Sequence, residues 1–502
     1  MEEQTLKARF RKMEKDREPF LDRAQRASLL TQPALFPPDE HNEYSNLKDP
    51  FQSQGSRGVE NLTSKMLTAL FPPGVVWFKY RLTPEGENAI TGSPSVNQRT
   101  KGQIDSILLD RAKKVWGVLE QPWFRPRLTE LFRHLIVGGN GILQQLPKSQ
   151  KFRFIPLHNY VCYRDGSDNL LDVIIKERVD PRMLSEDLQA VYEEAQDSTL
   201  YTIYERKDRN TFRTWQELGE TRVEGSEAEI PEKYLPVLVL RWEQISGEHY
   251  GRSFCDKIMG DLATLEGLSE STLEIAAEAA RLVYLVDPAG VTNIDDCEQA
   301  YNGDYISGRE QDVGTMKVDK LQDLQTASAL TTDVREGIKQ AFFDGETIQR
   351  SGERVTAFEI QYLASQLDNA LGGTYSLQAE EIQGPILRLT ERRLILDKSL
   401  DVLPEELVEA KLVTGLEGLG RSAEVQAYNN FDALVAQSIP PEEQMLLFNY
   451  HERATRMAVI AGIQDQGYIV SLEDYRKAQQ SRLNAQALRA ATPAITNELQ
   501  NG

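Results

Sequence analysis

Two stretches with helical periodicity flank a short segment without it, and this order limits the folds open to the chain. Apolar side chains recur every three or four residues in both stretches, first at Ile258, Leu262, Leu265, Leu268 and Ile275, then at Leu330, Val334, Ile338 and Phe342. Such spacing places them on one face of a helix. The intervening segment, Val283 to Val318, is rich in Gly, Asp and Asn and is expected to be a short β-containing insert. The sequence therefore predicts a long helix ending near Arg281, the insert, and a second helix that needs a neighbour to cover its apolar stripe.

Other helices are predicted on both sides of this unit. Residues 5 to 30 have helical periodicity, with Pro19 expected to break or kink the helix. A helix is expected from Gly58 to Leu70, and two more between 100 and 138 around Pro122 and Pro126. After a polar loop, Gly345 to Gly352, a third long helix carries Ile360, Leu363, Leu367 and Leu371, with a kink predicted at Gly372-Gly373. Residues 380 to 491 are expected to be largely helical.

Residues 142 to 245 have a different pattern. β-branched and aromatic residues alternate with polar ones, for example in Phe152-Arg153-Phe154-Ile155 and Tyr201-Thr202-Ile203-Tyr204. Turn sequences such as Asp165-Gly166 and Asp208-Arg209-Asn210 separate the runs. Alternation of this kind predicts a mostly antiparallel β region.

The charge and cysteine content exclude several classes of protein. With 57 basic and 77 acidic residues among 502, the net charge is -20, which disfavours a protein that grips DNA by neutralising phosphates. The three cysteines, Cys162, Cys255 and Cys297, are too dispersed for a zinc site or a disulfide scaffold. No apolar run is long enough to cross a bilayer, and the charged N-terminus lacks the core of a signal peptide, so the chain is expected to begin in a cytosol.

A search for catalytic motifs finds none. The chain has no Gly-Lys dipeptide, so it cannot contain a phosphate-binding P-loop, and it has no GxSxG or HExxH pattern. Gly415 to Gly420 is interpreted as a turn between helices, and Asp165 to Asn169 as a β-turn because Leu170 stands where a calcium loop needs glycine. No catalytic residue, metal ligand or cofactor is predicted.

One charge pattern on the first long helix is unusual. Glu266, Glu270, Glu274 and Glu278 recur every fourth residue and fall on one stripe of the helix. Like charges at this spacing weaken a helix slightly. The stripe is either a solvated outer face, or a surface that repels a polyanion or pairs with a neighbouring subunit.

Several local sequences resemble the portal, or head-to-tail connector, family of short-tailed double-stranded DNA bacteriophages. They are Arg57-Gly58-Val59-Glu60-Asn61-Leu62, Leu70-Phe71-Pro72, Glu248-His249-Tyr250-Gly251-Arg252-Ser253, Val286-Asp287-Pro288-Ala289-Gly290, Arg350-Ser351-Gly352-Glu353-Arg354-Val355-Thr356 and Leu371-Gly372-Gly373-Thr374-Tyr375. The likeness runs from about residue 10 to 430 and is densest between 245 and 378. The tail after about 430 departs from the pattern.

The resemblance implies an α+β, mainly helical portal fold. By analogy, residues 1–250 form the N-terminal wing with its antiparallel β region, and 251–282 and 327–346 form the paired stem helices. Residues 283–326 form a small β-containing clip, 347–430 the tunnel loop, kinked helix and rest of the wing, and 431–502 a helical crown.

The resemblance also implies a function without catalysis. Portal subunits form a ring, typically of twelve, at one vertex of a virion assembled in the bacterial cytoplasm, and DNA passes through it without sequence-specific binding. The implied partners are other copies of the chain, a terminase motor that supplies ATP hydrolysis, tail adaptor and tail proteins, and the major capsid and scaffolding proteins. Another virion or tail protein, or a magnesium-dependent DNA-processing enzyme, is the alternative function.

The polar loop is the candidate for contact with DNA. Gln349, Arg350, Glu353 and Arg354 are expected to line the narrowest part of the channel. Arginine suits brief contacts with phosphate. The alternative is that Arg350 or Arg354 caps a helix or pairs with an acid on the adjacent subunit.

Overall fold

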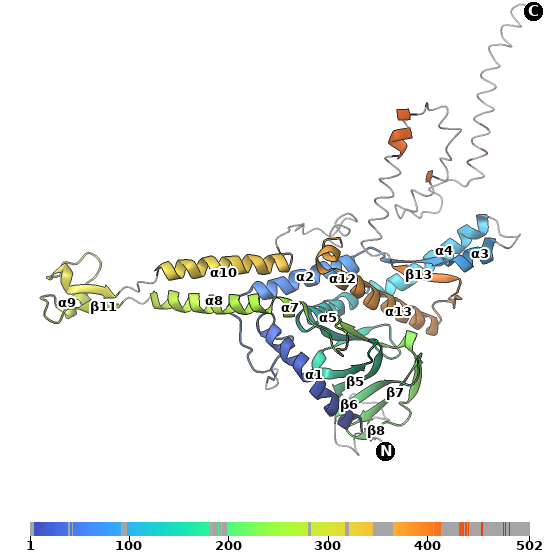
Figure 1. The fold of residues 1–502 in the computed structure, drawn as a ribbon, viewed down its shortest axis with the longest axis horizontal. Coiled ribbons are helices and arrows are strands. Elements are labelled where there is room, and N and C mark those ends of the chain that lie inside the picture. Colours follow the sequence, from blue (N-terminus) through green and yellow to red (C-terminus); the bar gives the residue numbers. More distant parts are fainter. Residues whose placement is uncertain are drawn as a thin grey trace, which may run out of the picture. The chain divides into compact units, whose positions relative to one another are not determined.

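The computed structural model describes residues 5–38, 41–42, 44–91, 98–180, 198–279, 283–316, 321–344, 365–404 and 406–412, with isolated residues between 182 and 192 and between 431 and 481. Internal contacts divide the chain into two units, Met1–Thr414 and Gly415–Gly502. The first unit is a mixed α+β structure in which every strand pairing is antiparallel across its described part (Figure 1). No helix among the described residues is both long enough and apolar enough to span a bilayer.

A helix packs across the larger sheet of the β region. The sheet has the order β4 (Tyr160–Arg164), β5 (Leu170–Arg178), β6 (Thr199–Arg206), β7 (Thr211–Leu218), β8 (Thr221–Arg222), and β9 (Ala228–Pro231) also pairs with β7. Helix α1 (Leu6–Leu29) lies against β4 and β6. Its first half buries Leu6, Phe10 and Met13 in a cluster with apolar side chains of these strands. The β region predicted from residue 142 onward is confirmed.

The expected break at Pro19 is wrong, because α1 continues through it. Pro19 lies on the exposed side of the helix. The carbonyl group that its missing N–H leaves without a helical partner can therefore bond to water. Both halves of the helix are held by packing, Phe10 and Met13 on the sheet and Ala24 and Ala27 in the main core. Tertiary contacts therefore outweigh the cost of proline here.

The main core lies between a smaller sheet and several helices. The sheet has the order β10 (Val237–Arg241), β2 (Asn140–Gln145), β3 (Phe152–Ile155). Helix α5 (Phe124–Gly138) leads directly into β2 and packs against both this sheet and α2 (Gln54–Leu70). Helices α3 (Pro84–Thr91) and α4 (Gln98–Leu119) follow β1 (Phe78–Leu82). Short 3-10 turns, η1 (Leu157–Asn159) and η3 (Glu232–Tyr234), precede β4 and β10.

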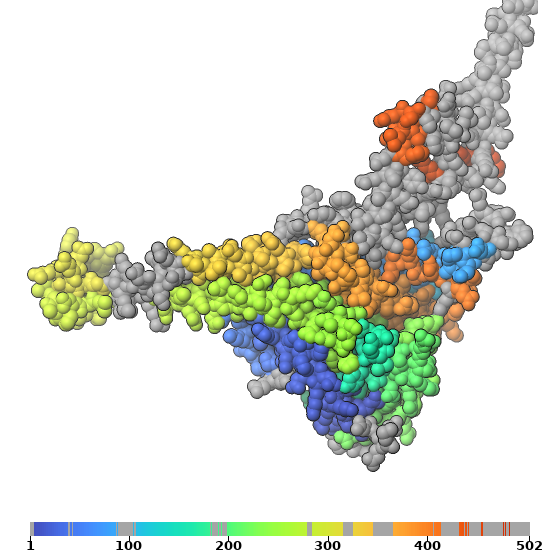
Figure 2. Space-filling view, viewed as in Figure 1, coloured from blue at the N-terminus to red at the C-terminus, as the bar shows by residue number. Residues whose placement is uncertain are grey.

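Two long helices pack side by side, in the positions that the periodicity predicts. After the single turn α7 (Phe254–Lys257) comes α8 (Met259–Ala279), and α10 (Leu321–Ala341) lies against it (Figure 1). Figure 2 shows their side chains in contact along the pair. Between them in sequence, β11 (Val283–Val286) pairs with β12 (Val313–Met316), with α9 (Ile294–Gln299) and the turn η4 (Glu310–Asp312) in the connection.

The chain after residue 364 combines helix, a wide turn and an unexpected strand. Gly372 has a φ of +57°, and the helix α12 (Gly373–Gln378) begins after it, which agrees with the interruption predicted there. A short π-helix, η5 (Ala379–Gln383), joins α12 to α13 (Gly384–Leu396). The expectation of a largely helical chain from residue 380 is wrong at β13 (Val408–Leu412), which pairs with β1. Its partner lies more than 300 residues away in sequence, so only tertiary pairing makes these five residues a strand. The turn expected at Gly415 to Gly420 lies outside the described residues.

Candidate functional site at the base of the helical pair

The helical pair is fixed at one end only. Leu262 and Leu265 near the start of α8, and Ile338 and Phe342 near the end of α10, are completely buried. The two helices therefore run antiparallel, with their buried ends on α2 and α7. Farther from this base, large apolar side chains are uncovered in the subunit, with Leu273 61% exposed and Leu330 51% exposed.

Two glycines of α2 make the base possible. A Cβ atom on Gly58 would lie 2.2 Å from Cδ2 of Phe342, and one on Gly55 would lie 2.5 Å from the carbonyl oxygen of Leu30. The Phe342 ring thus occupies the place of a side chain at position 58, and it also contacts the ring of Phe254 with 5.2 Å between the centroids. This close packing explains why position 58 is a glycine.

The four glutamates of the acidic stripe do not share one environment. Glu266 is half-buried, and its Oε1 accepts a hydrogen bond from the backbone N–H of Phe51 at 2.8 Å. Glu270 is half-exposed, while Glu274 and Glu278 are exposed. Within the described part of the chain none of the four forms an ion pair. Glu266 thus ties a loop to α8, whereas Glu274 and Glu278 are exposed in the single subunit.

Gln349, Arg350, Glu353 and Arg354 lie outside the described residues, which end at Asp344 and resume at residue 365.

A joint of close backbone contacts connects the β region to α7 and α8. Asn140 Nδ2 donates to the carbonyl of Gly251 at 2.9 Å, and the N–H of Gly251 donates back to Asn140 Oδ1 at 2.7 Å. A Cβ on Gly251 would lie 2.7 Å from Cβ of Arg241. Gly139, with a φ of +73°, approaches the same segment. The next residue pair, Ser253 and Asp256, forms a capping box that starts α7. The Gly251-Arg252-Ser253 sequence therefore fixes the start of α7, which leads into α8.

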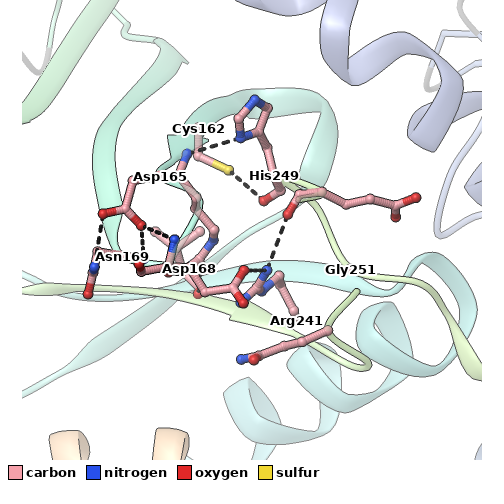
Figure 3. Close-up of polar contacts among 12 residues, drawn as sticks. Cys162, Asp165, Asp168, Asn169, Arg241, His249 and Gly251 are labelled. Carbon is pink, nitrogen blue, oxygen red and sulfur yellow. Dashed lines mark hydrogen bonds and ion pairs between the residues drawn. The ribbon is translucent and has the colours of Figure 1, made fainter. Parts of the chain in front are cut away.

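A nearly buried arginine lies under this joint (Figure 3). Arg241 is 2% exposed, and its Nη1 donates to Asp168 Oδ1 at 3.0 Å and to the carbonyl of Glu248 at 3.3 Å. Asp168 reaches it from the turn that Asp165 closes by accepting from the N–H groups of Ser167 and Asn169. The β-turn predicted at 165–169 is present, but its role in pairing Arg241 was missed. The turn sequence alone carries no signal of a partner 73 residues away.

The titratable groups near the joint are structural. Nδ1 of His249 accepts a hydrogen bond from the N–H of Arg164 at 3.1 Å, so that nitrogen is already occupied. Burial raises the pKa of the Cys162 thiol to about 11 and raises that of Cys255 as well, so neither is a ready nucleophile. Burial, together with the charges of His158 and Arg133, lowers the pKa of His134 to about 3, which keeps it neutral. The described residues contain no group of three or more potential ligands that could hold a metal ion.

Comparison with known proteins identifies the family. Residues 3–469 match the model of the bacteriophage head to tail connecting protein. The portal protein of Escherichia phage T7 is 30% identical over 498 residues, covering 95% of this chain and 91% of that protein. The portal protein of Enterobacteria phage T3 is 31% identical over 435 residues, covering 84% and 80%. The chain belongs to the head-to-tail connecting, or portal, family. Among solved structures, a chain in the virion of a native gene transfer agent particle is similar with a TM-score of 0.39 and 11% identity, covering 85% of this chain and 92% of that chain.

Family membership confirms the resemblance seen in the sequence. The protein is a phage portal protein of the head-tail junction, with a structural role in the virion. It also confirms that the role is structural rather than enzymatic, and it decides against the DNA-processing enzyme considered as an alternative.

The Asp168–Arg241 pair gives a test of the joint. Asp168→Asn keeps the side-chain size and the preference for the positive φ of +66° at this position but removes the charge that faces Arg241. We expect a loss on the order of 2 kcal/mol in unfolding free energy, because a guanidinium remains buried without its counter-charge. Adding Arg241→Met should recover part of this loss, since it removes the buried charge that Asp168→Asn leaves without a counter-charge. Urea unfolding of the subunit measures both, with Asp22→Asn, at an exposed aspartate of α1, as the control. Equal midpoints for Asp168→Asn and the control would contradict the assignment.

Proposed function

We propose that twelve copies of this portal subunit form a ring around a channel through which double-stranded DNA is packaged and ejected. The observation that carries the ring is the helical pair. Its base is covered by α2, whereas Leu273 and Leu330 farther along α8 and α10 are uncovered in the single subunit. Neighbouring copies on either side would bury these side chains.

The net charge supports a passive conduit. Twelve copies of a chain with a net charge of -20 would carry 240 negative charges, far from a clamp on phosphate. DNA carries about one charge per 1.7 Å of its axis, so an attractive lining would hold it tightly. An acidic or mixed lining keeps the interaction weak, and local arginines can add brief contacts.

We also assign the regions of a portal subunit, its wing, stem and crown, to parts of this chain. We assign residues 1–250 and part of 347–430 to the wing, α8 and α10 to the stem, and 431–502 to the crown. The ring would lie at one vertex of a virion assembled in the bacterial cytoplasm, in contact with the major capsid and scaffolding proteins.

The segment between α8 and α10 is proposed as the clip, the docking surface for the terminase motor and the tail. Its described residues, 283–316, contribute no side chain to the hydrophobic clusters of the subunit. Its order comes from Asp312, whose Oδ2 accepts from the N–H of Val291 at 2.9 Å, and from the N–H and hydroxyl of Thr292 at 3.1 and 2.8 Å. Several large apolar side chains are left uncovered, namely Tyr284, Leu285, Val291, Ile294, Tyr301, Tyr305 and Ile306. A polar framework that exposes apolar side chains suits a docking surface.

The loop after α10 is proposed to touch the passing DNA through Gln349, Arg350, Glu353 and Arg354. With twelve subunits, Arg350 and Arg354 would place twenty-four guanidinium groups around the channel. Arginine matches phosphate geometry, and its contacts weaken as salt increases.

Assembly tests the ring. The wild-type protein should run in light scattering at many times the mass of its 56.9 kDa subunit, in low and in moderate salt, and negative-stain images should show rings with a central hole. Leu273→Glu with Leu330→Glu should shift it toward monomer, because charge would replace apolar contact between copies. Leu396→Glu, on α13 and 62% exposed, is the matched control. A wild-type protein that stays monomeric at micromolar concentration under both salt conditions would count decisively against the ring.

Removal of the clip tests the docking surface. A short Gly-Ser linker in place of residues 285–314 should leave rings intact, because this segment adds nothing to the hydrophobic clusters of the subunit. Packaging of DNA should be abolished, since the motor would have lost its docking surface. DNA packaging assays with purified motor measure this. Packaging at the wild-type level would contradict the assignment of this segment as the docking surface.

Substitution of the two loop arginines tests the contact with DNA. Arg350→Gln with Arg354→Gln should preserve assembly and filling but alter DNA retention or ejection, and the difference should shrink as salt is raised. Arg182→Gln, an exposed arginine paired with Asp180, is the control. If the arginines instead cap a helix or pair with a neighbouring acid, the ring itself should weaken. Wild-type assembly, retention and ejection would argue against both explanations.

A further inference from the structure

Helix α10 ends in a conformation that its own sequence does not favour. The N–H of Asp344 donates to the carbonyl of Lys339 at 2.8 Å, and Phe343 has a φ of +57°. This is the left-handed turn that commonly ends a helix and is usually made by glycine. A bulky aromatic residue rarely adopts it and is strained there. Something outside the helix must therefore stabilise this end.

Three side chains of α2 supply that stabilisation. Asn61 Nδ2 donates to the carbonyl of Phe342 at 3.0 Å, and Lys65 Nζ donates to the carbonyl of Phe343 at 2.5 Å. Gln54 Nε2 donates to Asp344 Oδ2 at 2.9 Å. With Gly58, which makes room for the Phe342 ring, these residues are spaced four, three and four apart and share one face of α2.

The contacts match what a helix C-terminus needs. The last carbonyls of a helix have no partner within it, and its negative end attracts a cation. The Lys65 ammonium meets both needs, and it also lies 5.8 Å from the centroid of the Phe343 ring. Because Phe342, Phe343 and Asp344 are each held, the chain has a fixed direction at the last described residue before position 345.

We propose that Gln54, Asn61 and Lys65 are positioning residues for the DNA-contacting loop. They fix the direction in which the chain leaves α10 toward Arg350 and Arg354, and they connect that loop to α2 in the main core. This inference rests on the proposed function of the loop. Glycine at position 343, with water bonded to the last carbonyls, would be enough to end the helix stably. The three side-chain hydrogen bonds do more, because they fix the direction in which the chain leaves α10.

The test compares Asn61→Ala with Lys65→Ala against a control on the outward side of the same helix, Ser64→Ala with Thr68→Ala. Rings of the first variant should form, and the amides of Phe343 and Asp344 should exchange with solvent about tenfold faster, as expected when a capping contact is lost. DNA retention should change as it does in Arg350→Gln with Arg354→Gln. Combining all four substitutions should add little, because both pairs act through one loop. Lys65→Arg, which keeps a donor, should retain most of the wild-type behaviour.

The outcomes separate this inference from the function on which it rests. If the loop arginines alter retention but Asn61→Ala with Lys65→Ala does not, the positioning role is overturned and the loop assignment stands. If the arginine substitutions change nothing, the loop assignment itself fails. Should the alanine variant form no rings, hydrogen exchange is measured on the free subunit, and wild-type exchange at Phe343 and Asp344 there overturns the inference.

Discussion

The packing of Phe342 over Gly58 is the contact on which the rest of the helical pair depends. It fills the space of a side chain on α2, and it fixes α10 against the core while α8 is fixed beside it by Leu262 and Leu265. Any larger residue at position 58 would push α10 away, and the exit of the chain toward the loop would move with it. The close approach of α10 to α2 at Gly58 thus determines where the proposed DNA-contacting loop begins.

The joint at Gly251 performs the same task for α8. The reciprocal hydrogen bonds with Asn140 and the buried Arg241 place the start of α7 against the smaller sheet. Polar contacts of this kind are directional, so they define an orientation in a way that apolar packing alone does not. The base of α10 and the start of α7 are therefore each defined by a close contact at a glycine, Gly58 and Gly251.

The sequence predicts the long periodic elements well and the tertiary contacts poorly. Helices α2, α8 and α10 and the β region follow from spacing, because their apolar faces repeat over many residues. The strand β13 could not be predicted, since its five residues become a strand only by pairing with β1. The continuity of α1 through Pro19 and the left-handed turn at Phe343 also depend on packing and capping partners distant in sequence. The pairing of Asp168 with Arg241 has the same cause.

The distribution of polar and apolar groups fits a subunit that works by shape and position. The buried cysteines and His134 are held away from their reactive forms, and the buried charges near the joint are used to orient helices. Uncovered apolar side chains lie instead on the helical pair and on the segment between its helices. A single copy leaves these surfaces exposed to water at a cost that other protein surfaces would remove. This distribution supports the proposed ring, in which neighbouring copies would cover these surfaces.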